Sequence, residues 1–146
     1  MSTEHEVKVL AAAERYAPEI LAFLRAMIAI PSESGGEAGV IARIAAEMRA
    51  CGFDEVKIDG FGNVLGRVGD GPRVVAIDGH VDTVGVGDPG TWARDPYGGA
   101  VEGGVVYGRG ASDQEAGVAA AADGARIAKE LGLLDGVTLW VSGTVM

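Results

Sequence analysis

Residues 74–82, Val-Val-Ala-Ile-Asp-Gly-His-Val-Asp, decide how this chain folds. The unbroken apolar run from Val74 to Ile77 predicts a strand that is covered on both faces of a sheet. Polar residues follow it at once, and ligands of open α/β folds bind at the edge where strands end. Because residues i and i+2 of an extended chain point the same way, Asp82 can hold the imidazole ring of His80 in one tautomer while the other ring nitrogen binds a metal. The same short His-x-Asp pattern also occurs in ordinary polar loops. The rest of the chain therefore has to distinguish a metal site from such a loop.

Helices and strands are expected to alternate on both sides of this stretch, which predicts an α/β fold. The expected helices cover residues 4–30, 34–51 and 112–131, and the expected strands cover residues 55–58, 63–68, 74–77, 105–107 and 137–141. Two capping-box patterns, each a Ser followed three residues later by a Glu, are expected to open the second and third helices, at Ser34 and Ser112. A turn at residues 69–72 and the short strands before it predict a hairpin, so the sheet is expected to be mixed.

Composition argues against several classes of partner. The 146 residues carry a net charge of -9 and no cluster of Lys and Arg, which disfavours nucleic acid and anionic membranes. The polar, acidic N-terminus lacks the pattern of a signal peptide, and the single cysteine, Cys51, cannot form an internal disulfide, so a cytoplasmic location is expected. Cys51 falls on the apolar face of the second expected helix and is interpreted as a small core residue.

A second group of polar residues precedes the third expected helix. Asp113 stands where a helix dipole favours a carboxylate, so a capping role alone would explain it. The pair Gly108 and Gly110 suggests a dinucleotide loop, but Asp113 occupies the position of the third glycine of that motif and would repel a pyrophosphate. A cation fits better, because His80, Asp82 and Asp113 are expected to converge at one sheet edge, where an imidazole and carboxylates suit zinc.

Several short motifs follow one another in a fixed order along most of the chain. They are Ile30-Pro-Ser32, Gly62-Asn-Val64, His80-Val-Asp-Thr-Val84, the segment from Trp92 to Tyr97, and Gly108-Arg-Gly-Ala-Ser-Asp113. In this order and spacing they resemble the M20 metallopeptidase family, which includes acetylornithine deacetylase and succinyl-diaminopimelate desuccinylase. The run Ser-Asp-Gln-Glu at residues 112–115 is most similar to the branch of selenium-metabolism-linked hydrolases, whereas more typical members have Met-Lys-Gly after the Asp.

The resemblance implies a fold, a reaction and a set of residue roles. The fold would be a zinc-peptidase-like αβα arrangement of three layers around a mixed central sheet, and the reaction would be hydrolysis of amide or peptide bonds in small acylated amino acids or peptides. His80 would bind one zinc ion and Asp113 would bridge two. Asp82 would orient His80, which is its catalytic role, and cobalt or manganese could take the place of zinc. A cis peptide bond is expected between Asp113 and Gln114.

The resemblance also implies that part of the enzyme lies outside this sequence. Residues 1–146 would form the N-terminal part of a truncated catalytic domain, without the acidic pair that contains the general base, the remaining metal ligands and the lid domain through which many members dimerise. The 146-residue chain alone is then expected to bind zinc weakly and not to hydrolyse amides, and the full-length protein is expected to be a homodimer. The alternative is a non-catalytic fragment or partner module that keeps the fold without the chemistry.

Overall fold

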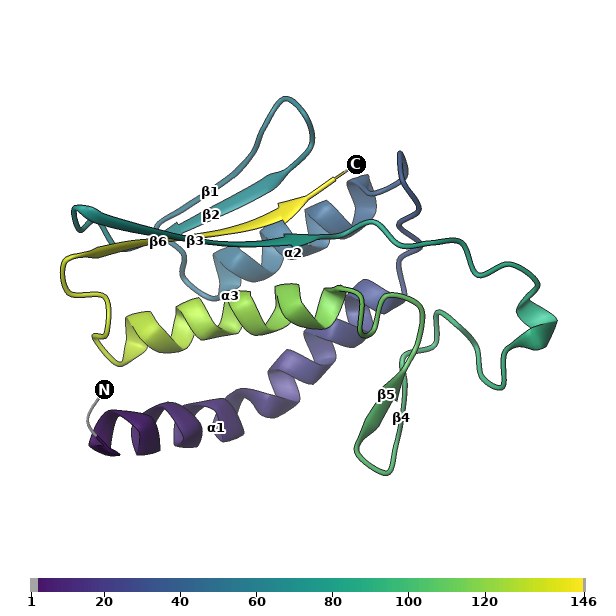
Figure 1. Ribbon diagram of the computed structural model, residues 1–146, viewed down its shortest axis with the longest axis horizontal. Coiled ribbons are helices and arrows are strands. Elements are labelled where there is room, and N and C mark those ends of the chain that lie inside the picture. Colours follow the sequence, from purple (N-terminus) through teal and green to yellow (C-terminus); the bar gives the residue numbers. More distant parts are fainter. Residues whose placement is uncertain (1–2, 146) are drawn as a thin grey trace.

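The computed structural model describes residues 3–145, which form a mixed β-sheet with helices on one side and a separate two-stranded ribbon (Figure 1). The helices are α1 (Thr3–Ile28), α2 (Ala38–Ala50) and α3 (Glu115–Glu130). The strands are β1 (Glu55–Ile58), β2 (Val64–Val68), β3 (Arg73–His80), β4 (Ala100–Glu102), β5 (Val105–Tyr107) and β6 (Val137–Thr144), and a short 3-10 helix, η1, covers Pro89–Thr91. β4 and β5 pair with each other in the ribbon.

The main sheet has the strand order β1-β2-β6-β3. β1 and β2 form an antiparallel hairpin, β6 runs antiparallel to β2, and β3 runs parallel to β6. The predicted α/β fold with a mixed sheet is therefore confirmed. The hairpin of that sheet lies between β1 and β2, whereas the turn at residues 69–72 carries the chain across β6, which lies between β2 and β3.

All three helices lie on the same side of this sheet (Figure 1). α2 packs against β1 and β2, α3 packs against β3 and β6, and α1 packs mainly against α3. Of the three expected layers, residues 3–145 therefore supply the sheet and the helices of one side. The prediction that the apolar run of β3 is covered on both faces is wrong for residues 3–145, because helices cover only one face of the sheet and β3 lies at its edge. Val74 is 63% exposed, and Val75 and Ile77 are each 42% exposed.

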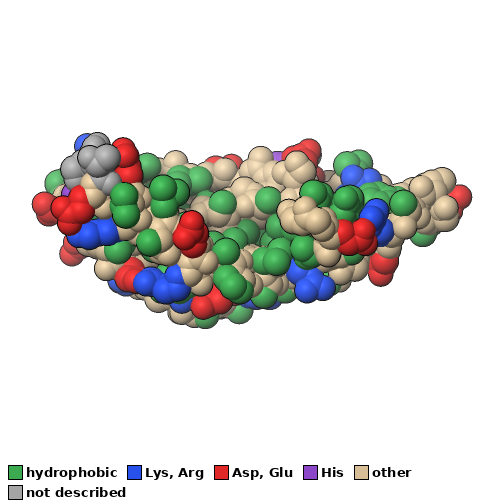
Figure 2. All heavy atoms as spheres, turned by 90° about the horizontal axis from the view of Figure 1, so that it is seen from below, with side chains coloured by type: hydrophobic (Ala, Val, Ile, Leu, Met, Phe, Trp, Pro, Cys, Tyr) green, Lys and Arg blue, Asp and Glu red, His purple; other side chains and the backbone are tan. Residues whose placement is uncertain are grey.

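The hydrophobic core fills the space between the sheet and the helices. Its fully buried side chains include Phe23, Met27, Ile28, Val40, Ile44, Met48, Val64, Val118 and Val141. Cys51 is 8% exposed, so its predicted burial is confirmed. Figure 2 views the molecule from the α1 side and shows further hydrophobic side chains between acidic and basic ones on that outer surface. None of the helices within residues 3–145 is both long enough and apolar enough to span a membrane.

The starts of α2 and α3 differ from the predicted capping boxes. α2 follows Glu37 and α3 follows Gln114, and neither start has a side-chain cap hydrogen bond. Ser34 instead donates a hydrogen bond to Asp82, at 3.3 Å between Oγ and Oδ2. Glu115 turns into the protein interior, where it is 1% exposed. Ser34 and Glu115 thus make tertiary contacts, and neither forms the helix cap that the local pattern predicted.

Candidate metal centre

The end of β3 presents the polar residues of the candidate site. His80 is the last residue of β3, and it pairs in parallel register with Thr144 of β6. Asp82 follows it two residues later, and Asp113 lies in the turn that leads into α3. The backbone N–H of Val81 donates to the carbonyl oxygen of Thr144 at 2.9 Å, so the chain is still held against β6 as it leaves the strand.

The structure brings His80, Asp82 and Asp113 together. Nδ1 of His80 lies 3.1 Å from Oδ1 of Asp82 and 3.1 Å from the backbone oxygen of the same residue. Nε2 of His80 lies 2.9 Å from Oδ1 of Asp113. The imidazole ring is therefore held between two carboxylates, with one ring nitrogen facing each of them.

Exposure increases across the site from Asp82 to Asp113. The side chain of Asp82 is 18% exposed, that of His80 is 39% exposed and that of Asp113 is 84% exposed. Ser34 is a further residue of this site that the sequence placed at a helix cap. Its hydroxyl donates a hydrogen bond to the second carboxylate oxygen of Asp82. No local signal identifies this contact, since the two residues are 48 positions apart in the chain.

The electrostatics of the site favour a positive charge on or near the imidazole. Partial burial lowers the pKa of His80, but hydrogen bonds and charge interactions with Asp113 and Asp82 outweigh it, and the net effect raises the pKa. The donor set also fits a divalent metal, because an imidazole nitrogen and a carboxylate oxygen are both zinc ligands. With Nδ1–H donated to Asp82, the lone pair on Nε2 remains available for a metal, which is the usual arrangement of histidine ligands.

The turn that carries Asp113 matches the expected geometry in one detail, since the peptide bond between Asp113 and Gln114 is cis. The same turn requires glycine at Gly110, which has a φ of +80°. A Cβ there would lie 2.8 Å from the methyl carbon of Thr83 and 2.8 Å from Cδ of Glu115. Only glycine lets the backbone pass between these two side chains without displacing one of them.

Glu115 lies directly beneath this turn, and the sequence patterns did not predict its burial. Its Oε2 is buried and has no hydrogen-bond partner among residues 3–145, while its backbone N–H donates to the carbonyl oxygen of Gly110 at 3.0 Å. Burial raises the pKa of Glu115 to about 8, so its carboxyl group is protonated at neutral pH.

We expect Glu115→Gln to flatten the dependence of stability on pH. The unfolded chain releases this proton near a pKa of about 4.3, whereas the folded protein holds it up to a pKa of about 8. The contribution of Glu115 to the free energy of unfolding is therefore complete below the lower value and falls as the pH rises through the upper one. Denaturant unfolding at about pH 5 and about pH 9 gives the free energy of unfolding at each pH. If that free energy fell by the same amount between the two pH values in the parent chain and in the variant, the prediction would be contradicted.

Known proteins resemble this chain over most of its length. Residues 76–145 match the family model described as peptidase family M20/M25/M40. The chain is 50% identical over 137 residues to the uncharacterized protein YgeY of Escherichia coli K12. This match covers 94% of this chain and 34% of that protein. It is 35% identical over 111 residues to a succinyl-diaminopimelate desuccinylase of Rhodospirillum centenum, covering 71% of this chain and 29% of that enzyme. The chain thus spans about a third of the length of these relatives.

Solved structures share the fold. Human carnosine dipeptidase 1 matches with a TM-score of 0.78 at 22% identity, over 92% of this chain and 33% of that one. The di-peptidase Dug1p of Saccharomyces cerevisiae matches with a TM-score of 0.81 at 20% identity, over 96% of this chain and 34% of that one. At this identity the likeness establishes the mixed α/β architecture, and nothing about substrates follows from it.

Proposed function

Because the chain belongs to the M20/M25/M40 peptidase family, we propose that it supplies part of the active site of a metal-dependent amide hydrolase. The substrates would be small acylated amino acids or peptides. Succinyl-diaminopimelate, which the name of the desuccinylase relative gives as its substrate, belongs to this class. The observation that carries the proposal is the imidazole of His80 held between the carboxylates of Asp82 and Asp113.

The three residues have distinct roles in this proposal. Nε2 of His80 and the carboxylate of Asp113 would hold a divalent ion such as zinc, and cobalt or manganese suits the same donors. The carboxylate of Asp113 is 84% exposed, which leaves it accessible to a second ion that shares it with the first. A bound ion of this kind supplies polarisation of the scissile carbonyl and activation of water for its attack.

Asp82 is a positioning residue for His80 in this proposal. It accepts a hydrogen bond from Nδ1, and its second oxygen accepts one from Ser34, so the ring is fixed before any ligand arrives. The hydrogen bond keeps the proton on Nδ1 and directs the lone pair of Nε2 toward Asp113. Such second contacts also raise the basicity of the histidine that they orient.

The test of the proposed function is metal-dependent release of amine from a panel of N-acyl amino acids and dipeptides. The assay should use the 146-residue chain and any longer product of the same reading frame, each before and after chelation and after the return of zinc, cobalt or manganese. We expect hydrolysis by the form that contains the complete site, its loss on chelation, and its return with metal. Failure of every form to hydrolyse the panel with every metal would contradict the proposal.

Replacing Asp82 with asparagine is expected to weaken zinc binding by about 10–100-fold, the usual effect of losing a carboxylate that orients a histidine ligand. The amide is neutral and accepts the Nδ1–H hydrogen bond less strongly, so the ring orientation is less well fixed. Zinc affinity can be measured by competition with a chromophoric chelator. Asp135→Asn makes the same chemical change at an exposed position and should leave the affinity unchanged; an equal loss in both variants would refute a specific role for Asp82.

A further inference from the structure

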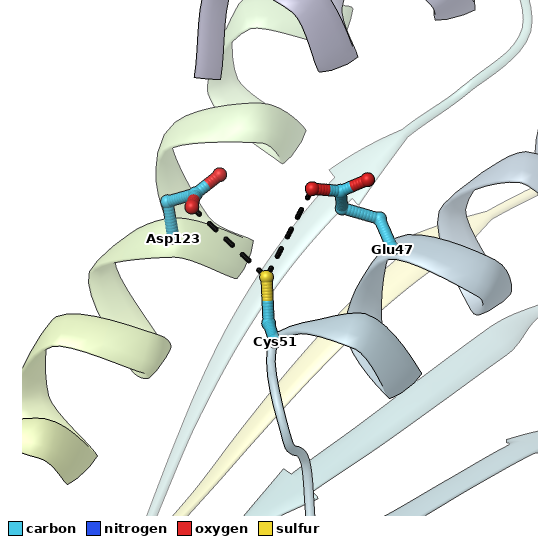
Figure 3. Close-up of side chains that lie close together, drawn as sticks. All are labelled: Glu47, Cys51 and Asp123. Atoms are coloured by element: carbon cyan, nitrogen blue, oxygen red, sulfur yellow. Dashed lines mark hydrogen bonds between the residues drawn. The ribbon is translucent and has the colours of Figure 1, made fainter. Parts of the chain in front are cut away.

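A second cluster of metal-ligating side chains lies between α2 and α3, on elements other than the one that carries His80. Glu47, Cys51 and Asp123 point toward one another there (Figure 3). The Sγ atom of Cys51 lies 4.0 Å from Oε1 of Glu47 and 4.0 Å from Oδ1 of Asp123. Glu47 and Cys51 are four residues apart, so they share one side of the helix end, and Asp123 faces them from α3.

The cluster is buried and incompletely satisfied. Asp123 is 1% exposed, and its Oδ2 is a buried atom with no hydrogen-bond partner among residues 3–145. Cys51 is 8% exposed, and the side chain of Glu47 is 14% exposed. Two carboxylates that face each other in such a place are unfavourable unless a positive charge lies between them.

The cationic side chains nearby do not fill this position. Arg43 binds Oε2 of Glu47 at 2.6 Å, which leaves Oε1 of that carboxylate facing Cys51. Arg126 makes its short contact with Glu19, at 2.7 Å, and reaches only Oδ1 of Asp123, at 3.6 Å. The two arginines therefore offset part of the charge, but within the described part of the chain neither makes an ion pair with Oε1 of Glu47 or with Oδ2 of Asp123.

We propose that Glu47, Cys51 and Asp123 form a second divalent-metal site, of the zinc class, that joins α2 to α3. Tetrahedral zinc places sulfur and oxygen ligands about 3.6 Å apart, given Zn–S and Zn–O bonds of about 2.3 and 2.1 Å. The observed separations of 4.0 Å are close to that value, so small side-chain rotations bring the atoms into place. The thiol favours zinc and similarly thiophilic ions over magnesium or calcium, and water completes the coordination.

Without a metal, the surroundings of the cluster favour the protonated forms of its side chains. Burial, followed by the charges of Asp123 and Glu47, raises the pKa of Cys51 to about 11, so without metal the thiol keeps its proton. Burial and the charge of Glu47 also raise the pKa of Asp123. Zinc binding displaces such protons, because the thiolate and the carboxylate are the ligand forms.

Cobalt titration of the chain tests this site, because Cys51 is the only cysteine and any thiolate-to-cobalt charge-transfer band must come from it. The titration uses Co²⁺ as the probe and a phosphine reductant to keep the thiol reduced. We expect a saturable band in the near ultraviolet that zinc displaces. The band should disappear in Cys51→Ser, and the cobalt affinity should fall at least about 10-fold in Asp123→Asn. It should persist in His80→Ala, which changes only the site at β3.

Several outcomes would overturn the proposal. Absence of the band at saturating cobalt, or an unchanged cobalt affinity in Asp123→Asn, excludes the three-residue site. X-ray absorption of the zinc-loaded parent chain gives an answer that needs no variant, because the proposal requires one sulfur neighbour at the zinc. Persistence of the band in His80→Ala with no amide hydrolysis in any form would contradict the proposed function while leaving this second site intact.

Discussion

Replacing His80 with alanine is expected to abolish metal-dependent hydrolysis by the form that contains the complete site. It is also expected to weaken zinc binding at the β3 site by more than about 100-fold, beyond the effect of losing an orienting carboxylate. The imidazole is the only nitrogen donor among the three residues, and it connects Asp82 to Asp113. Without it, the exposed carboxylate of Asp113 is left with no second ligand from β3. Zinc competition titration and initial rates of amine release measure the two effects.

The chain offers a matched control for this substitution. His5 is the other of its two histidines, lies in α1, and can also be replaced by alanine. His5→Ala should keep the parent zinc affinity and the parent rate. The cobalt–thiolate band of the second site, measured in His80→Ala, separates loss of the β3 site from general unfolding. Hydrolysis by His80→Ala at the parent rate would rule out the assigned role.

Replacing Gly71 with alanine is expected to lower the free energy of unfolding by about 3 kcal/mol or more, at the upper end of overpacking effects. A Cβ at this position would lie 2.0 Å from the carbonyl carbon of Gly136 and 2.1 Å from the backbone nitrogen of Val137. Backbone atoms cannot rotate away as a side chain can. Relief therefore requires the loop before β3 to separate from the start of β6.

That separation would break the contacts that set the register of β3. The hydroxyl of Thr138 donates a hydrogen bond to the carbonyl oxygen of Gly71 at 2.6 Å. The backbone N–H of Arg73 donates one to the carbonyl oxygen of Gly136 at 3.2 Å. Denaturant unfolding gives the comparison, with Gly60→Ala as the control, since a Cβ at Gly60 meets nothing within 4 Å. The control should stay within about 0.5 kcal/mol of the parent chain. Equal midpoints for the two variants would show that the loop adjusts freely.

Local patterns predicted the elements of this fold better than their arrangement. The alternation of helices and strands and the mixed sheet follow from periodicity and turn residues, which act over a few positions. The placement of β6 between β2 and β3 depends on pairing with residues about 70 positions earlier, as in Val64 with Gly143 and Arg73 with Val137. No local pattern encodes that choice, and for the same reason the apolar run of β3 did not reveal that it lies at an edge.

In the candidate site, too, the sequence predicted contacts between nearby residues better than contacts between distant ones. His80 and Asp82 are close in the chain, so their spacing alone indicates that they can meet. Ser34 and Glu115 were assigned to helix caps, because the pattern of a cap is local while their actual environments are tertiary. Helical spacing predicted the burial of Cys51, but it says nothing about what the facing helix presents, and here α3 presents Asp123.

The position of β3 at the edge of the sheet also bears on how copies of this chain behave in solution. Within residues 3–145, its outer side offers unpaired backbone groups beside exposed valine and isoleucine side chains, a combination that pairs readily with another strand. Arg73 and Asp78 flank the apolar run and act as charged gatekeepers against such pairing. The net charge of -9 adds long-range repulsion between copies. As acidification removes that charge, colloidal stability falls, and edge-to-edge self-association through β3 becomes the first route to precipitation.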